Sequence, residues 1–113
     1  MLISGSQDEW DASSSAENAA GMQSVYAWFG KWGEAGKIAD GGARLDRPDT
    51  ARTVRAGATS PIITDGPAAE LKEVLGGIVM LLAADLDEAV AIAATWPTLQ
   101  GSTSLEVRPI LET

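Results

Sequence analysis

The sequence predicts an α+β fold in which two helices cover one face of a small sheet. Three observations lead to this prediction. Apolar residues recur at helical spacing in residues 16–35 and 86–96, an apolar run at residues 78–82 does not alternate, and short strand-like segments lie between them. The length of 113 residues is typical of one domain, so we expect a single domain over residues 1–113.

The start of the chain predicts a short strand followed by a long helix. Leu2-Ile3 opens the strand, and residues 5–15 are polar and acidic, which is typical of a loop. A helix over residues 16–35 follows, with capping-box spacing between Ser14 and Glu17. One helical face carries Met22, Val25, Phe29 and Trp32. Tyr26 and Trp28 fall outside this stripe, so one of them could face a pocket or a partner.

The middle of the chain predicts one strand and then a hairpin. Residues 37–45 form a strand with a bulge or bend at Gly41-Gly42. A turn at residues 46–49 leads to two strand-like segments, 50–55 and 61–64, which are separated by a glycine-containing turn.

The second half predicts a strand, a helix and a last strand. Residues 68–74 could form one or two helical turns, and Gly76-Gly77 then bends the chain into the apolar strand 78–82. A strand of that composition is usually covered on both faces. A helix capped by Asp85 and a strand over residues 104–111 complete the chain.

The order of these elements is strand, helix, strand, hairpin, strand, helix, strand. Without the inserted hairpin it is a split βαβ pattern, the ferredoxin-like arrangement. Two helices cover one face of such a sheet, and the apolar strand 78–82 needs a cover on the other face. We therefore expect a homodimer in which two copies of the chain pack sheet against sheet about a two-fold axis.

Composition excludes several classes of partner and chemistry. A net charge of −8 argues against nucleic acid and anionic membranes, because phosphate binding needs clustered Lys and Arg. The absence of Cys fits a cytoplasmic protein, and the absence of His removes the commonest acid–base residue and metal ligand. We find no signal peptide, no apolar run long enough to span a membrane, and no motif that calls for a cofactor or a metal.

The turn Thr64-Asp65-Gly66-Pro67 is the best candidate for a functional site. Pro67 and Gly66 define the corner, and Asp65 places one carboxylate on it just after an apolar strand. Asp65 could act as a catalytic acid or base in a cleft, or it could be a turn former that bonds its own backbone. Arg55 could hold an anionic group of a ligand. The candidate ligand-binding residues are Arg55, Gly66, Pro67, Glu70, Lys72 and Trp28.

Each of these ligand-binding residues also has a structural interpretation. Glu70 and Lys72 fit a solvated helical face with local charge pairing. Arg55 fits a surface strand, and Trp28 fits core or dimer packing as well as stacking on a flat ligand.

The corner and its surroundings resemble a known family. Thr64-Asp65-Gly66-Pro67, followed by Glu70, Lys72-Glu73 and Leu75-Gly76-Gly77, is similar to the motif of the YCII-related, DGPF-type domain family. Segments 85–89 and 106–109 also match its pattern. The chain departs from that pattern at Ala68, where the family usually has Phe, and at Leu71, where it usually has Thr.

The resemblance implies a ferredoxin-like domain that pairs into a dimeric α/β barrel. Related branches are regarded as possible enzymes because of a His–Asp pair, which cannot exist in a chain without His. We expect a small-molecule-binding protein with a barrel cleft near Asp65. One alternative is a cofactor-free enzyme that uses Asp65 as a proton shuttle on a small aromatic or carbonyl compound. The other is a regulatory partner of a sigma factor, because some relatives are joined to sigma factors.

Overall fold

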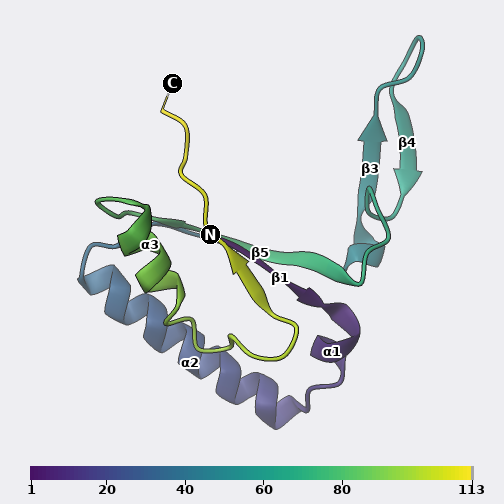
Figure 1. Ribbon diagram of the computed structural model, residues 1–113. Helices are drawn as coiled ribbons and strands as arrows, with labels where there is room; N and C mark the ends of the chain where they lie inside the picture. The colour runs from purple at the N-terminus through teal and green to yellow at the C-terminus, as the bar shows by residue number, and fades with distance from the viewer. Residues whose placement is uncertain (113) are drawn as a thin grey trace.

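An antiparallel sheet carries the helices on one side, and a separate hairpin stands at one end (Figure 1). The computed structural model describes residues 1–112. The main sheet has the strand order β2-β5-β1-β6. Its strands are β1 (Leu2–Ser6), β2 (Ile38–Arg44), β5 (Glu73–Leu81) and β6 (Ser104–Glu106). The helices are α1 (Gln7–Asp11), α2 (Ser15–Glu34) and α3 (Leu86–Ala93). The hairpin consists of β3 (Arg52–Arg55) and β4 (Ile62–Asp65), and a 3-10 turn, η1 (Pro48–Thr50), precedes it.

The strand order confirms the ferredoxin-like arrangement and the inserted hairpin. The units β1-α2-β2 and β5-α3-β6 interleave, so that β1 and β5 lie at the centre of the sheet. All three strand pairs are antiparallel. The sheet of one chain is open and forms no closed barrel within the described residues.

Local sequence signals set the ends of the two long helices. At the start of α2, Ser14 and Glu17 form the predicted reciprocal capping box. Gly36, with a φ of 72°, adopts the left-handed conformation that commonly ends a helix. At the start of α3, the Asp85 side chain accepts a hydrogen bond from the Glu88 amide.

The core lies between the helices and one face of the sheet, and it includes Trp28. The expectation that Trp28 falls outside the buried stripe is wrong. Its ring packs edge-on against Trp96 at a centroid distance of 4.9 Å, and its indole N–H donates to Thr95 Oγ1. Val79 and Ile92 complete this cluster of buried residues. Trp28 lies on the same helical face as the four stripe residues, because it follows Val25 by three positions and precedes Trp32 by four.

The loop expected over residues 5–15 contains regular structure instead. Strand β1 continues to Ser6, whose side chain caps α1 by accepting from the Glu9 amide. The short helix points Trp10 back at the sheet, where its indole N–H donates to Thr103 Oγ1 over 3.2 Å. This packing stabilises a helix that its polar sequence does not indicate.

The helical turns expected over residues 68–74 are absent, because β5 begins at Glu73 and pairs with β1. Gly76 and Gly77 lie inside that strand rather than in a bend before it. The register runs from Ile3 opposite Gly77 to Ser4 opposite Leu75, which leaves Gly76 as the extra residue of a bulge. The ring of Trp10 fills the space where a Cβ at Gly76 would lie.

The last strand is much shorter than expected. It ends at Glu106, opposite Leu2 at the start of β1, and not at Leu111. Residues 107–112 run past the sheet without forming strand hydrogen bonds, and their apolar side chains Ile110 and Leu111 are exposed. Within residues 1–112, no helix is both long and apolar enough to cross a bilayer.

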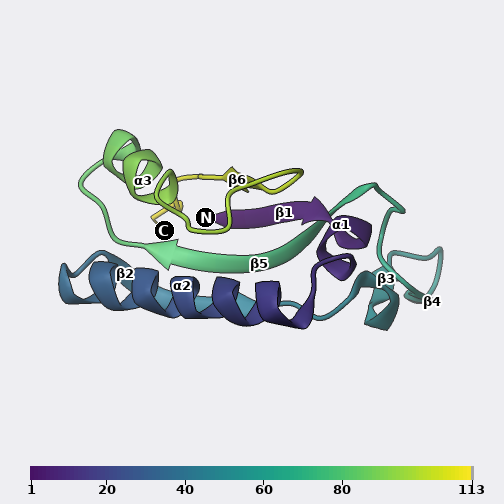
Figure 2. The same ribbon diagram turned by 90° about the horizontal axis from the view of Figure 1, so that it is seen from below.

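Helices cover one face of the main sheet and leave the other face uncovered. Figure 2 views the sheet from the side on which α2 and α3 lie across it. Leu2, Ile78 and Met80 alternate along their strands with Ile3 and Val79, which pack in the core, so their side chains lie on the other side. Within residues 1–112 no helix covers this side (Figure 1), and we call it the open face. The hairpin and residues 107–112 project toward the side of the open face (Figure 1).

Candidate functional site at the base of the hairpin

The predicted corner lies at the base of the hairpin and is tied to the start of β3. Gly66 has a φ of 90°, a conformation that side chains with a Cβ rarely adopt. Its amide donates to the carbonyl of Ala51 over 2.7 Å, and its own carbonyl accepts from Thr53 Oγ1 over 2.8 Å. The sharp turn at Gly66-Pro67 is therefore held by hydrogen bonds to a different segment, which makes it a fixed feature of the surface.

Arg55 reaches the same corner from β3. Its Nη2 atom donates to the carbonyl oxygen of Ala68 over 2.5 Å. The structure thus brings together three residues that the sequence selected separately, Arg55, Gly66 and Pro67. In the single chain, this N–H group of the guanidinium is already engaged in a hydrogen bond to the backbone of the corner.

Asp65 points into solvent rather than into an enclosed site. Its side chain is 95% exposed, and its carboxylate lies 3.6 Å from Nε of Arg52 on the paired strand. Ion pairs this exposed contribute about 0–1 kcal/mol to stability. Within residues 1–112, the carboxylate is therefore not enclosed.

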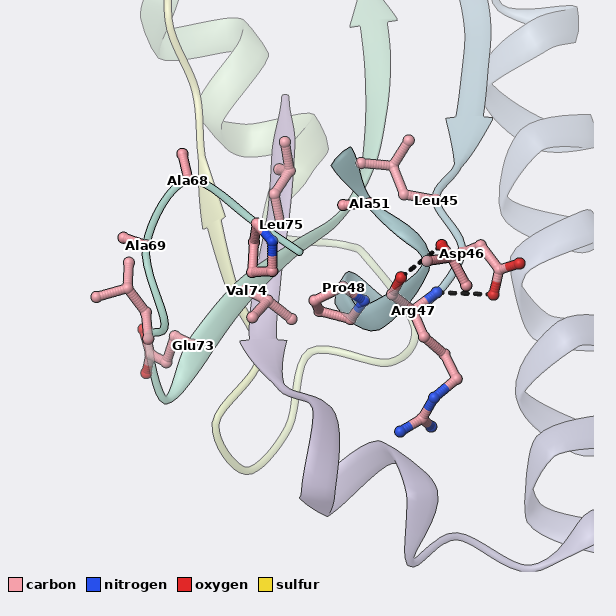
Figure 3. Close-up of a pocket in the computed structure, with 13 residues that line it drawn as sticks. Leu45, Asp46, Arg47, Pro48, Ala51, Ala68, Ala69, Glu73, Val74 and Leu75 are labelled. Carbon is pink, nitrogen blue, oxygen red and sulfur yellow. Dashed lines mark hydrogen bonds between the residues drawn. The ribbon is translucent and has the colours of Figure 1, made fainter. Parts of the chain in front are cut away.

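A pocket opens beside the corner, between the hairpin base and the end of the main sheet (Figure 3). It is a half-open depression rather than an enclosed cavity, with a volume of about 500 Å³. Its walls come from three segments: the connection after β2, the corner itself, and the start of β5. Most of the lining is aliphatic. The lining residues are Leu45, Asp46, Arg47, Pro48, Thr50, Ala51, Pro67, Ala68, Ala69, Leu71, Glu73, Val74 and Leu75.

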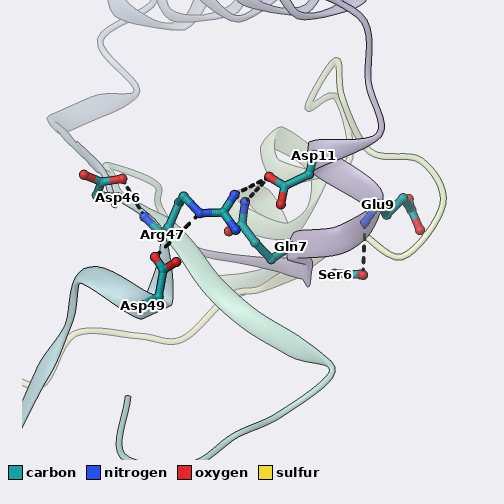
Figure 4. A network of polar contacts seen from close by, with 7 residues as sticks. All are labelled: Ser6, Gln7, Glu9, Asp11, Asp46, Arg47 and Asp49. Atoms are coloured by element: carbon teal, nitrogen blue, oxygen red, sulfur yellow. Dashed lines mark hydrogen bonds and ion pairs between the residues drawn. The ribbon is translucent and has the colours of Figure 1, made fainter. Parts of the chain in front are cut away.

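The polar rim of this pocket is organised by Arg47 (Figure 4). Its Nη1 atom pairs with Asp11 Oδ1 at 2.6 Å, and its Nε atom lies 3.6 Å from Asp49. Gln7 donates to the same oxygen of Asp11. The hydrogen bond from Arg47, helped by that from Gln7, holds the pKa of the Asp11 carboxyl below its ordinary value. Arg47 is thereby fixed at the rim by α1 and η1.

The other candidate residues lie apart from the pocket. Glu70 and Lys72 are exposed on the segment between the corner and β5, and neither is among the lining residues that the structure describes. Trp28 is in the core on the helix side of the sheet. Across residues 1–112, no three His, Cys, Asp or Glu side chains come together in a way that could hold a metal ion.

Sequence reasoning missed Arg47 and the apolar wall around it. The only signal was a charged, proline-containing turn at residues 46–49, which is typical of an ordinary connection. Its role depends on α1, a helix that the sequence did not indicate, because Asp11 of that helix positions the guanidinium.

Comparisons with known proteins support the resemblance of the motif. The family model described as "YCII-related domain" matches residues 6–113. The chain is also similar to "Uncharacterized protein R00369" of Rhizobium meliloti (strain 1021). The two are 40% identical over 98 residues, which is 86% of this chain and 78% of that protein. A family match over nearly the whole length, together with this identity, shows that the chain belongs to the YCII-related domain family.

Proposed function

We propose that this YCII-related domain is a homodimer that binds a small, mainly apolar molecule at the base of each hairpin. The observation that carries the proposal is the aliphatic pocket beside the Asp65 corner. Two copies pack through their open faces, and each keeps one pocket. Asp65 and Arg55 belong to the surroundings of the ligand rather than to its walls.

The size and lining of the pocket support a small-molecule ligand. Pockets for such ligands usually measure about 300–1,000 Å³ and combine an apolar lining with a few fixed polar groups. Here the volume is about 500 Å³, with Arg47 and Thr50 among the polar lining residues. The corner contributes Pro67, Ala68 and Ala69, whose short side chains leave space for a ligand.

The extended shape of the single chain and its uncovered sheet face support the dimer. A compact domain of this length has a radius of gyration of about 13 Å, whereas that of this chain is 16.2 Å. The open face exposes apolar side chains that a second copy would cover, with the two sheets packed face to face. A two-fold axis makes such contacts self-complementary.

The alternatives from the sequence have weaker support. A proton shuttle at Asp65 needs a carboxylate enclosed with its substrate, whereas this carboxylate is open to water and outside the pocket. The proposal of a sigma-factor partner rests on the association of relatives, and no contact among residues 1–112 bears on it.

The substitution Ala68→Phe tests the ligand site. Ala68 lines the pocket, and Arg55 binds only its backbone carbonyl, so a phenyl ring would occupy the cavity while this hydrogen bond can persist. A thermal-shift screen of small apolar compounds on the unmodified protein should give hits whose shift disappears in Ala68→Phe. Ala27→Phe, at an exposed position of α2, is the matched control and should keep every hit. Hits that survive Ala68→Phe would place ligand binding elsewhere.

A further inference from the structure

We infer that each β3–β4 hairpin packs against the second copy of the chain, so that the corner carrying Asp65 is enclosed only in the dimer. This inference rests on the dimer proposed above and adds a second contact to it. Four observations support it: the weak attachment of the hairpin, its exposed apolar face, its direction, and its charge.

The hairpin has little support from its own chain. In the part of the chain that the structure describes, its two strands form a sheet of their own and pair with no strand of the main sheet. The hydrogen bonds at its base link Ala51, Thr53 and Arg55 to the corner that follows β4, so they join the two ends of the hairpin to each other. A two-stranded hairpin in water is marginally stable by itself, and packing against another surface is the usual remedy.

One face of the hairpin presents an apolar pair to solvent. The register sets Val54 opposite Ile63, and each of these side chains is 65% exposed. The same face carries the ion pair between Arg52 and Asp65. Branched apolar side chains paired across two strands are typical of a buried sheet surface, so this face is suited to contact with protein.

The hairpin points to where the second copy would sit. In Figure 1 it rises from the end of the sheet toward the side of the open face, opposite to the helices. Residues 107–112 rise on the same side, nearer the other end of β5. A second sheet seated on the open face would therefore lie beside the hairpin, which is positioned to contact its flank.

The charges favour a copy of this same chain as the occupant. The hairpin carries Arg52 and Arg55 against one acid, Asp65, within a chain of net charge −8. The rest of the chain is accordingly the acidic part. On the open face, Asp40 lies opposite Met80 in the strand register, whereas Glu106, opposite Leu2, is paired with Arg108. Arg52 is paired with Asp65 on the apolar face, so the hairpin has a net charge of +1 from Arg55 on its other face, and the rest of the chain carries −9. These net charges attract the hairpin to the body of a second copy, and the two-fold axis repeats the contact.

A single introduced thiol tests the contact, because the natural sequence has no Cys. We expect Ile63→Cys to react with a maleimide about tenfold more slowly when about nine-tenths of the chains are dimeric than when the protein is dilute, since labelling then proceeds through the free fraction. Sedimentation measures the dimeric fraction of the same samples. Tyr26→Cys, on the exposed side of α2 and 69% exposed in the single chain, should react at one rate throughout.

The outcomes separate this inference from the dimer itself. If Ile63→Cys forms a dimer and its thiol reacts as fast as in the dilute protein, the inference is wrong. The proposed dimer would then still hold, and the apolar face of the hairpin would be available to a different protein. Absence of a dimer at any concentration would overturn both. Enclosure by the second copy is supported only if protection follows the dimeric fraction.

The double substitution Val54→Thr with Ile63→Thr gives a second measurement. Threonine keeps the strand preference of the hairpin and removes its apolar contact. The dissociation constant of the dimer should rise about tenfold or more, because two apolar side chains leave the interface. Tyr26→Gln is the control, and it should leave the constant unchanged. An unchanged constant in the double variant would contradict the inference.

Discussion

The two faces of β5 are made by neighbouring residues and have opposite surroundings. Val79 is 4% exposed beneath the helices, whereas Met80, the next residue, is 44% exposed on the open face. Both are apolar, so the sequence alone treats them alike. Because side chains alternate across a strand, a run of apolar residues fills both faces of the sheet, yet the chain supplies helices for only one. The comparison distinguishes the covered face, which stabilises the monomer, from the open face, which is available to a second copy.

The largest expected effect comes from placing a carboxylate on the covered face. Val79→Asp puts a charge without a partner between the sheet and the two core Trp residues, 28 and 96. We expect a loss of about 4 kcal/mol or more in the free energy of unfolding, enough to leave most of the protein unfolded. Circular dichroism and urea denaturation measure this loss.

The same substitution one residue later should act on assembly instead. Met80→Asp lies on the open face, so the monomer should lose only about 1–2 kcal/mol of its free energy of unfolding, from the low strand preference of Asp and from Asp40 opposite it. The dimer should dissociate, because the substitution brings two carboxylates into the proposed interface. Sedimentation of Met80→Asp and denaturation of the dilute protein distinguish the two effects. A dimer as stable as that of the unmodified protein would remove the open face from the interface.

A smaller effect is expected where Trp10 covers the end of the main sheet. In Gly76→Ala, the new methyl group would lie 2.7 Å from Trp10 Cη2, so the indole or the bulge must shift. Such overpacking costs about 1–3 kcal/mol. Gly33→Ala in α2 meets no atom within 4 Å and should stabilise the protein by about 0.5–1 kcal/mol. Denaturant titrations should therefore give changes of opposite sign, and equal signs would contradict the assigned role of Trp10.

The parts of the fold that depend on local sequence were predictable. The capping box at Ser14 and the cap at Asp85 fix the starts of two helices within a few residues, and the order of elements then gives the ferredoxin-like arrangement. Residues 68–74 show the limit of such reasoning. Their composition favours a helix, but pairing of Val74 with Gly5 across the sheet overrides it.

The candidate site divides in the same way. The corner at Gly66-Pro67 follows from residue types that adopt few conformations, and it could be found without a structure. The pocket beside it could not, because one wall comes from Leu45 and Pro48, about twenty residues earlier, and its rim depends on Asp11. Contacts between segments so far apart in the sequence leave no periodic signal along the chain.

The smallest expected effect concerns an ion pair on the covered side, between Lys37 beside β2 and Glu88 of α3. Lys37 Nζ lies 2.8 Å from Glu88 Oε1, and this hydrogen bond, with a weaker one from the Ala84 amide, lowers the pKa of Glu88 in the folded protein. A lowered pKa in the folded state means that the ionised form stabilises the fold. This stabilisation is therefore present above the pKa of the unfolded chain, about 4.3 for Glu, and is lost as the pH falls through the lower folded value.

Glu88→Gln should consequently lower the melting temperature at pH 7, and the difference from the unmodified protein should shrink as the pH falls below about 4. Asp87→Asn is the matched control, because it removes a charge from the same first turn of α3 without removing the partner of Lys37. If both variants show the same pH dependence, the effect belongs to the helix dipole, which favours any acid in that turn. If only Glu88→Gln shows this pH dependence, the ion pair between Lys37 and Glu88 causes it. That ion pair lies on the helix-covered side of the sheet, so it stabilises the monomer without any contribution from a second copy.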